Sequence, residues 1–258
     1  AGDLAGAEPY YRLALAATGK RLGERHPDYA VQVNNVASLL EDRGRLDDAA
    51  PLFTQSLAVR RAAYGEAHPA VARALHNLAR VELARGRASA AEPLASEALA
   101  LRRRLLAAGH AEIGASLALL GEIRARQGRP DEGERLLVEA LAVQRTALGA
   151  THPQAATTLL QLAALCLTTA RPAQAELYAA EAAAIRAERL PAGHWLRAMG
   201  DVTRAEALLA LGRSRDARAA LGDAPSVLAE RLGAQDRRAL RAARLSARLT
   251  GAPMRAGA

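Results

Sequence analysis

The fold is decided by the segment Gly65-Glu66-Ala67-His68-Pro69-Ala70-Val71-Ala72-Arg73-Ala74-Leu75-His76-Asn77-Leu78-Ala79. Its first histidine recurs every 42 residues, at His26, His68, His110, His152 and His194. A second series keeps the same step and consists of Gly2, Gly44, Gly86, Gly128, Ala170 and Gly212. A fixed period of this size is typical of a repeat protein, so we expect one elongated array.

Each repeat is predicted to contain two helices. In residues 26–67 the first helix begins at Pro27 and runs to about Asp42, because apolar residues recur there at intervals of three and four. Gly44 then ends the helix in the left-handed conformation. The second helix runs from about residue 47 to residue 62, with Pro51 in its first turn, where proline costs little.

The array is predicted to span residues 1–258 as a single domain. A half repeat covers 1–25, full repeats cover 26–67, 68–109, 110–151, 152–193 and 194–235, and a terminal helix with a tail covers 236–258. The fifth full repeat departs from the pattern, and Pro225 should kink or end its second helix. Small residues recur where paired helices should approach closely, at Ala37, Ala79, Gly121, Ala163 and Ala205 and at Ala49, Ala91, Gly133, Ala175 and Ala217.

The junctions between repeats carry a family resemblance. Residues 22–30 and 148–156 both read Leu-Gly-x-x-His-Pro-x-x-Ala, and Asn-x-Ala follows at 35–37 and 77–79. This combination resembles the tetratricopeptide repeat, in the 42-residue form of kinesin light chains rather than the usual form of 34 residues. The resemblance implies an all-α fold, a right-handed α-solenoid of antiparallel helix pairs. It also implies a non-catalytic protein–protein interaction scaffold, so we expect no enzyme activity.

Composition excludes several other classes of protein. The net charge is +8, but Lys20 is the only lysine, and richness in alanine and arginine is typical of a GC-rich, bacterial genome. Cys166 is alone, so no internal disulfide can form. No apolar run reaches the roughly 18 residues of a membrane span, and we predict a cytoplasmic protein without membrane contact. The chain begins within a repeat and without methionine, which suggests part of a longer protein.

The recurring histidines suggest a metal site, but their spacing argues against it. Equivalent residues of stacked repeats lie about 10 Å apart, whereas zinc needs ligands at about 2 Å. We interpret each histidine as the cap of a helix N-terminus, a role that Asp236 fills in the sixth copy. No Gly-rich phosphate loop or catalytic pair is visible, so we predict no metal, cofactor or catalytic residue.

Arginines form columns with the same period. One column follows the turns and consists of Arg45, Arg87, Arg129, Arg171 and Arg213. A second set lies at the ends of the second helices and consists of Arg60, Arg61, Arg102, Arg103, Arg104 and Arg145. We interpret both as charges that favour helix C-termini and solubility, and the arginine-rich terminal helix as a solvated cap. Nucleic-acid binding is the weaker alternative, because no aromatic side chains interleave with the arginines.

The most informative surface is the inner face of the first helices, which in the family that this chain resembles lines a concave groove. Arginine can bind a carboxylate with two hydrogen bonds, and an asparagine amide can bind a peptide backbone. We therefore predict a groove that binds a protein or peptide partner, acidic or ending in a carboxylate at its basic end. The predicted groove residues are Asn34, Asn35, Ser38, Arg73, His76, Asn77, Arg80, Leu119, Glu122 and Gln161.

Two further hypotheses concern the context of the array. It resembles the regulatory or substrate-recruiting repeat regions of larger bacterial signalling enzymes, namely Ser/Thr kinases, NTPase regulators and proteases. The first helix also presents Ala7, Tyr10, Tyr11 and Leu15 where a preceding helix would pack, so self-association through this end is possible.

Overall fold

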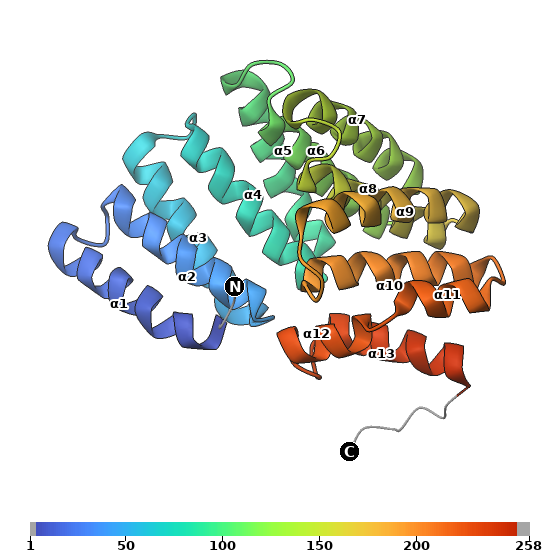
Figure 1. The fold of residues 1–258 in the computed structure, drawn as a ribbon. Coiled ribbons are helices and arrows are strands. Elements are labelled where there is room, and N and C mark those ends of the chain that lie inside the picture. The colour runs from blue at the N-terminus through green and yellow to red at the C-terminus, as the bar shows by residue number, and fades with distance from the viewer. Residues whose placement is uncertain (1–3, 252–258) are drawn as a thin grey trace. The chain divides into compact units, whose positions relative to one another are not determined.

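A computed structural model describes residues 4–251, and every regular element in them is an α-helix (Figure 1). The predicted turn at Gly2 and the predicted tail 252–258 lie outside the described residues. The chain divides into two compact units, Ala1–Leu136 and Leu137–Ala258, and the division falls within helix α7 (Pro130–Leu148). The repeat boundaries given above stay a prediction.

In the first unit, helices adjacent in sequence pack against each other, as α2 does against α3 and α4 against α5 (Figure 1). Its helices are α1 (Leu4–Leu22), α2 (Pro27–Asp42), α3 (Leu46–Tyr64), α4 (Pro69–Ala84), α5 (Ala88–Leu105) and α6 (Ala111–Arg126). The core lies between the helix pairs and includes Phe53, Leu40 and Leu75, each exposed by 1% or less.

The second unit repeats this arrangement and ends in shorter helices. After the second part of α7 come α8 (Pro153–Thr168), α9 (Pro172–Arg189), α10 (Trp195–Ala210), α11 (Ser214–Leu221), α12 (Ala224–Leu232) and α13 (Arg237–Thr250). The predicted effect of Pro225 is confirmed, because α11 ends before it and α12 begins with it in the first turn. Helix α10 packs against α12 and α13.

The histidine series marks helix starts, as predicted. Helices α2, α4, α6, α8 and α10 each follow a histidine whose Nδ1 accepts a hydrogen bond from the backbone N–H two residues on, at 3.1–3.2 Å. Asp236 does the same for α13, accepting from the N–H of Arg238 at 2.8 Å. These side chains satisfy one of the N–H groups that a helix N-terminus leaves unpaired. The first helices therefore begin at intervals of 42 residues.

The turn positions require a left-handed backbone. Gly44, Gly86, Gly128 and Gly212 adopt φ between 73° and 80°, which glycine reaches without steric cost. Ala170 occupies the same position with φ 56° and is the only residue other than glycine with positive φ within residues 4–251.

Small residues allow close helix contacts, as the sequence predicts. Ala37, Ala79 and Ala91 are fully buried. At Gly133 on α7, a Cβ atom would lie 2.8 Å from the carbonyl oxygen of Gly121 on α6, closer than carbon and oxygen can approach without movement of the backbone. The spacing of α6 and α7 in the first unit therefore depends on this glycine.

Candidate functional site

The first unit brings two predicted asparagines together. Nδ2 of Asn77 on α4 donates a hydrogen bond to Oδ1 of Asn34 on α2, at 2.9 Å. Asn35 and Ser38 of α2 are partly buried. One turn beyond Asn77, the exposed Arg80 forms an ion pair with Glu41 of α2, with 2.8 Å between nitrogen and oxygen. The first helices of successive repeats thus join through polar side chains at the predicted groove positions.

Two arginines that were interpreted as solvated charges are instead buried. Arg60 on α3 is 3% exposed and Arg102 on α5 is 4% exposed. Nη1 of Arg60 donates to the carbonyl oxygen of Ala70 at 3.1 Å, and Nη1 of Arg102 donates to that of Glu112 at 3.0 Å. The interpretation was wrong for these two residues because the first turn of the following helix covers them. Their role is to link one repeat to the next.

The same position carries a polar side chain in the second unit as well. Gln144 on α7 is 2% exposed and accepts a hydrogen bond from Oγ1 of Thr158 at 2.8 Å. Arg186 on α9 is 5% exposed, and its Nη1 donates to the carbonyl oxygen of Leu196. Burial lowers the pKa of Arg186 to about 10. A buried hydrogen-bonding side chain is therefore a regular part of the repeat interface in this chain.

Positive charge accumulates around these buried groups in the first unit. Burial lowers the pKa of Arg60, and the nearby charge of the exposed Arg73 lowers it further. Burial also lowers the pKa of Arg102; the Glu112 carboxylate, 3.3 Å away, offsets part of this effect, and Arg73 adds to it. Within residues 4–251, Glu112 is the only carboxylate that forms an ion pair with any of these three arginines.

His76 stays neutral among these charges. It lies on α4, with Nδ1 3.3 Å from Nη1 of Arg102. Burial, followed by the charges of Arg102 and Arg80, lowers the pKa of His76 from its ordinary value of 6.5 to about 3. The imidazole therefore offers a neutral polar group beside two guanidinium groups at physiological pH.

The other predicted residues contribute less to this surface. Leu119 on α6 is 6% exposed and packs in the interior. Glu122, also on α6, forms an ion pair with Arg126 one turn away. Gln161 belongs to α8 in the second unit and is partly buried. The predicted residues that meet in one place are those of α2 and α4.

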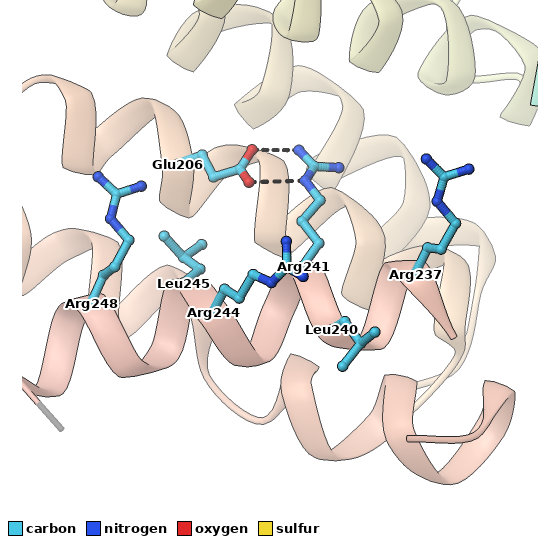
Figure 2. A pocket seen from close by; sticks show the side chains of 7 residues that line it. All are labelled: Glu206, Arg237, Leu240, Arg241, Arg244, Leu245 and Arg248. Atoms are coloured by element: carbon cyan, nitrogen blue, oxygen red, sulfur yellow. Dashed lines mark hydrogen bonds and ion pairs between the residues drawn. The ribbon is translucent and has the colours of Figure 1, made fainter. Parts of the chain in front are cut away.

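The second unit contains a basic pocket between α10 and α13 that sequence reasoning missed (Figure 2). The cavity measures about 560 Å³ and is lined by Glu206, Arg237, Leu240, Arg241, Arg244, Leu245 and Arg248. Nε of Arg241 donates to Oε1 of Glu206 at 2.9 Å, and the second carboxylate oxygen contacts the same guanidinium. The helix that was interpreted as a solvated cap therefore forms one wall of a pocket.

The repeat period gives a signal that could have located this pocket. Arg241, Arg244, Leu245 and Arg248 stand four periods of 42 residues after Arg73, His76, Asn77 and Arg80. In register with the earlier first helices, the arginines of the closing helix fall on the groove positions. Nearby, the guanidinium of Arg238 stacks over the ring of Trp195, 5.0 Å from its centroid.

Comparison with known families and proteins identifies the repeat. Two tetratricopeptide repeat models match the chain, one over residues 30–104 and 112–188 and the other over residues 1–28. No curated protein matches the sequence. None of the helices within residues 4–251 is long and apolar enough to cross a membrane.

Several solved structures share the fold. A putative kinesin light chain with nearly identical TPR-like repeats from Podosopora anserina is 24% identical over 80% of this chain and 97% of its own, with a TM-score of 0.60. BtubC (BKLC) from P. vanneervenii is 17% identical over 100% and 98%, with a TM-score of 0.66. A Rap protein complexed with Competence and Sporulation Factor is 14% identical over 97% and 72%, with a TM-score of 0.66. At these identities the likeness concerns the fold.

Proposed function

The chain belongs to the tetratricopeptide repeat family, and on this premise we propose that it is a protein-interaction scaffold that binds an acidic peptide segment or a C-terminal carboxylate. The proposed site lies on the first unit. We call it the amide–arginine surface, and it consists of Asn34, Asn35, Ser38, Arg73, His76, Asn77 and Arg80. The buried Arg60 and Arg102 contribute positive charge to it.

The observation that carries the proposal is the surplus of positive charge around Arg73. Arg60 and Arg102 are buried, Arg73 is exposed, and their one ion pair in the described part of the chain is with Glu112. A buried charge without a countercharge is costly, and like charges at short range add to the cost. A carboxylate bound at Arg73 would supply the missing countercharge.

The asparagine pair supports a peptide as the ligand. The bond between Asn77 and Asn34 uses one of the two N–H groups of Asn77 and one acceptor site of Asn34. The side-chain carbonyl oxygen of Asn77 and the side-chain amide NH₂ group of Asn34 can still form hydrogen bonds with a peptide backbone. His76 adds a neutral polar group that does not repel a neighbouring cation. We therefore propose that the amides hold the backbone while Arg73 binds the carboxylate.

The proposal can be tested with a labelled peptide of alternating glutamate and alanine residues that ends in a free carboxylate. Fluorescence anisotropy would compare it with its glutamine counterpart, for the full chain and for Arg73→Ala, Asn77→Ala and Arg80→Glu. Arg21→Ala is the matched control, because this exposed arginine lies on α1 outside the surface. We expect Arg73→Ala to weaken binding roughly tenfold, the worth of one charge-assisted hydrogen bond, and Asn77→Ala to weaken it roughly fivefold, because it removes a neutral hydrogen bond. Arg80→Glu should weaken binding at least roughly tenfold, because it reverses a charge, and the control should leave binding unchanged. Equal affinity of all variants would refute the proposal.

A further inference from the structure

We propose that the pocket between α10 and α13 is a second binding site, for an extended acidic peptide with carboxylates on alternate residues. This site lies in the second unit and uses none of the residues of the amide–arginine surface. We call it the α13 pocket, with the lining residues given above.

The charges of the α13 pocket are unbalanced. Four arginines and one carboxylate line it, and Glu206 is already engaged by Arg241, which also reaches Oγ1 of Thr203 at 3.3 Å. Arg244 and Arg248 are exposed, and within residues 4–251 neither forms an ion pair with an acid. Figure 2 shows Arg241 pointing toward Glu206, with Arg244 and Arg248 on the same helix beside it. The pocket therefore has cationic groups ready for an anionic ligand.

The arrangement along α13 makes this imbalance costly without a ligand. Arg244 and Arg248, which form no ion pair with an acid within residues 4–251, stand four residues apart on the helix. Like charges at this spacing face each other on a helix and destabilise it. A bound anion would remove this repulsion, so binding and the stability of α13 should be coupled.

The spacing of the arginines selects among anions. Arg244 and Arg248 are one helical turn apart, which corresponds to a rise of about 6 Å. In an extended peptide, alternate side chains point to the same side and lie about 6.6 Å apart along the strand. Two carboxylates separated by one residue would therefore each meet one guanidinium, in the bidentate geometry that arginine favours.

The rest of the lining favours a peptide over a nucleic acid or a small anion. Leu240 is partly buried and gives the pocket a small apolar part, which an aliphatic side chain of a peptide can cover, whereas Leu245 belongs to the core beneath it. The lining contains no aromatic ring on which a base could stack. The volume of about 560 Å³ lies within the range of ligand pockets, roughly 300–1,000 Å³, and is large for a single phosphate.

The chain carries its own reporter for this site. Trp195 is the only tryptophan, it begins α10, and Arg238 of α13 stacks over it. A ligand that reorganises α13 would change the contact between this guanidinium and the indole, and hence the emission of Trp195. The amide–arginine surface contains no tryptophan, so Trp195 emission reports the α13 pocket alone. Anisotropy and calorimetry respond to both sites, so the anisotropy comparison of the amide–arginine surface is made in a chain that carries Arg244→Gln and Arg248→Gln.

The experiment titrates the full chain with an acetylated and amidated peptide of alternating glutamate and alanine, followed by Trp195 emission and calorimetry. Its glutamine counterpart is the uncharged probe. The test variant is Arg244→Gln with Arg248→Gln, and the matched control is Arg215→Gln with Arg231→Gln, two exposed arginines of the same unit that do not line the pocket. Glutamine is a good helix former, so circular dichroism should show unchanged helix content.

We expect the glutamate peptide to bind, the test variant to weaken binding at least roughly tenfold, and the control to change it less than about twofold. Affinity should fall as salt rises toward about 0.15 M, because the contacts are exposed ion pairs. Arg73→Ala with Asn77→Ala should leave this signal unchanged. Three results would overturn the proposal: equal losses in test and control variants, equal binding of the glutamine peptide, or tighter binding of a single-stranded oligonucleotide or inorganic phosphate.

Discussion

His76 should make the stability of the first unit depend on pH. Its pKa in the folded chain is about 3, because burial and the charges of Arg102 and Arg80 disfavour the imidazolium, whereas an unfolded chain has the ordinary value near 6.5. Above pH 6.5 the side chain is neutral in both states and the free energy of unfolding is unaffected. As the pH falls below 6.5, the unfolded chain binds a proton that the folded chain does not, so stability is lost progressively toward pH 3.

The loss of stability can be calculated from the pH interval over which only the unfolded chain binds the proton. One pKa unit corresponds to about 1.4 kcal/mol, so complete exclusion of the proton between pH 6.5 and pH 5 would remove about 2 kcal/mol. His76 retains some exposure, which lets solvent screen the neighbouring charges. We therefore expect a loss of about 1–2 kcal/mol over this range. A cooperative unit with marginal stability should show such a loss clearly.

The assay compares the wild-type chain with His76→Gln, which keeps a polar side chain but cannot titrate. Urea unfolding followed by circular dichroism at pH 6.5 and pH 5 gives the loss for each chain, and groups common to both cancel in the difference. Because repeat arrays need not unfold in one step, NMR titration of the His76 ring provides a direct second measurement. A His76 resonance that titrates near pH 6.5, or identical pH dependence in both chains, would refute the reasoning.

Three other substitutions test the packing and the caps, each by thermal and urea unfolding. Gly133→Ala should destabilise the first unit by about 1–3 kcal/mol, because overpacking against the Gly121 carbonyl outweighs the gain of about 1 kcal/mol in helix propensity; increased stability would contradict this contact. Ala170→Gly should stabilise the second unit by about 1 kcal/mol, because φ 56° is strained for alanine, and a loss of stability would show that strain is absent. Asp236→Ala should cost about 1 kcal/mol through the lost cap of α13, whereas Asp236→Asn should retain most of it.

Much of the fold follows from the sequence because its determinants are local. Each recurring histidine is two residues before the backbone N–H that it caps. Each turn glycine is needed for the positive φ angle at its own position. The close approach at Gly133 was also predictable, because the small residue recurs in register with the period. The family model then confirms the resemblance seen at the repeat junctions.

The candidate site was less predictable because its properties depend on neighbours in space. Nothing near Arg60 or Arg102 in sequence shows that the next helix covers them. Both lie near the charge-rich C-terminal end of a helix, as the exposed Arg104 does. The bond between Asn77 and Asn34 requires two first helices to stand side by side, which the period implies but does not fix at atomic distances. The composition of α13 alone indicates a solvated helix, and its role in the α13 pocket depends on its place in the period and on Glu206 of α10.

The buried arginines restrict how such a chain can gain or lose residues during evolution. Arg60, Arg102 and Arg186 each bond to the carbonyl ten residues further along the chain. Excision of residues 68–109 would place Arg60 ten residues before Glu112, whose carbonyl Arg102 uses now. Loss or duplication of a whole 42-residue repeat of this kind therefore preserves the hydrogen bond from the buried arginine at the new junction, without a compensating substitution. A deletion of another length would move the first turn of the next helix relative to the guanidinium, so that no carbonyl oxygen would face it. The buried arginines therefore favour evolution of the array in whole repeats.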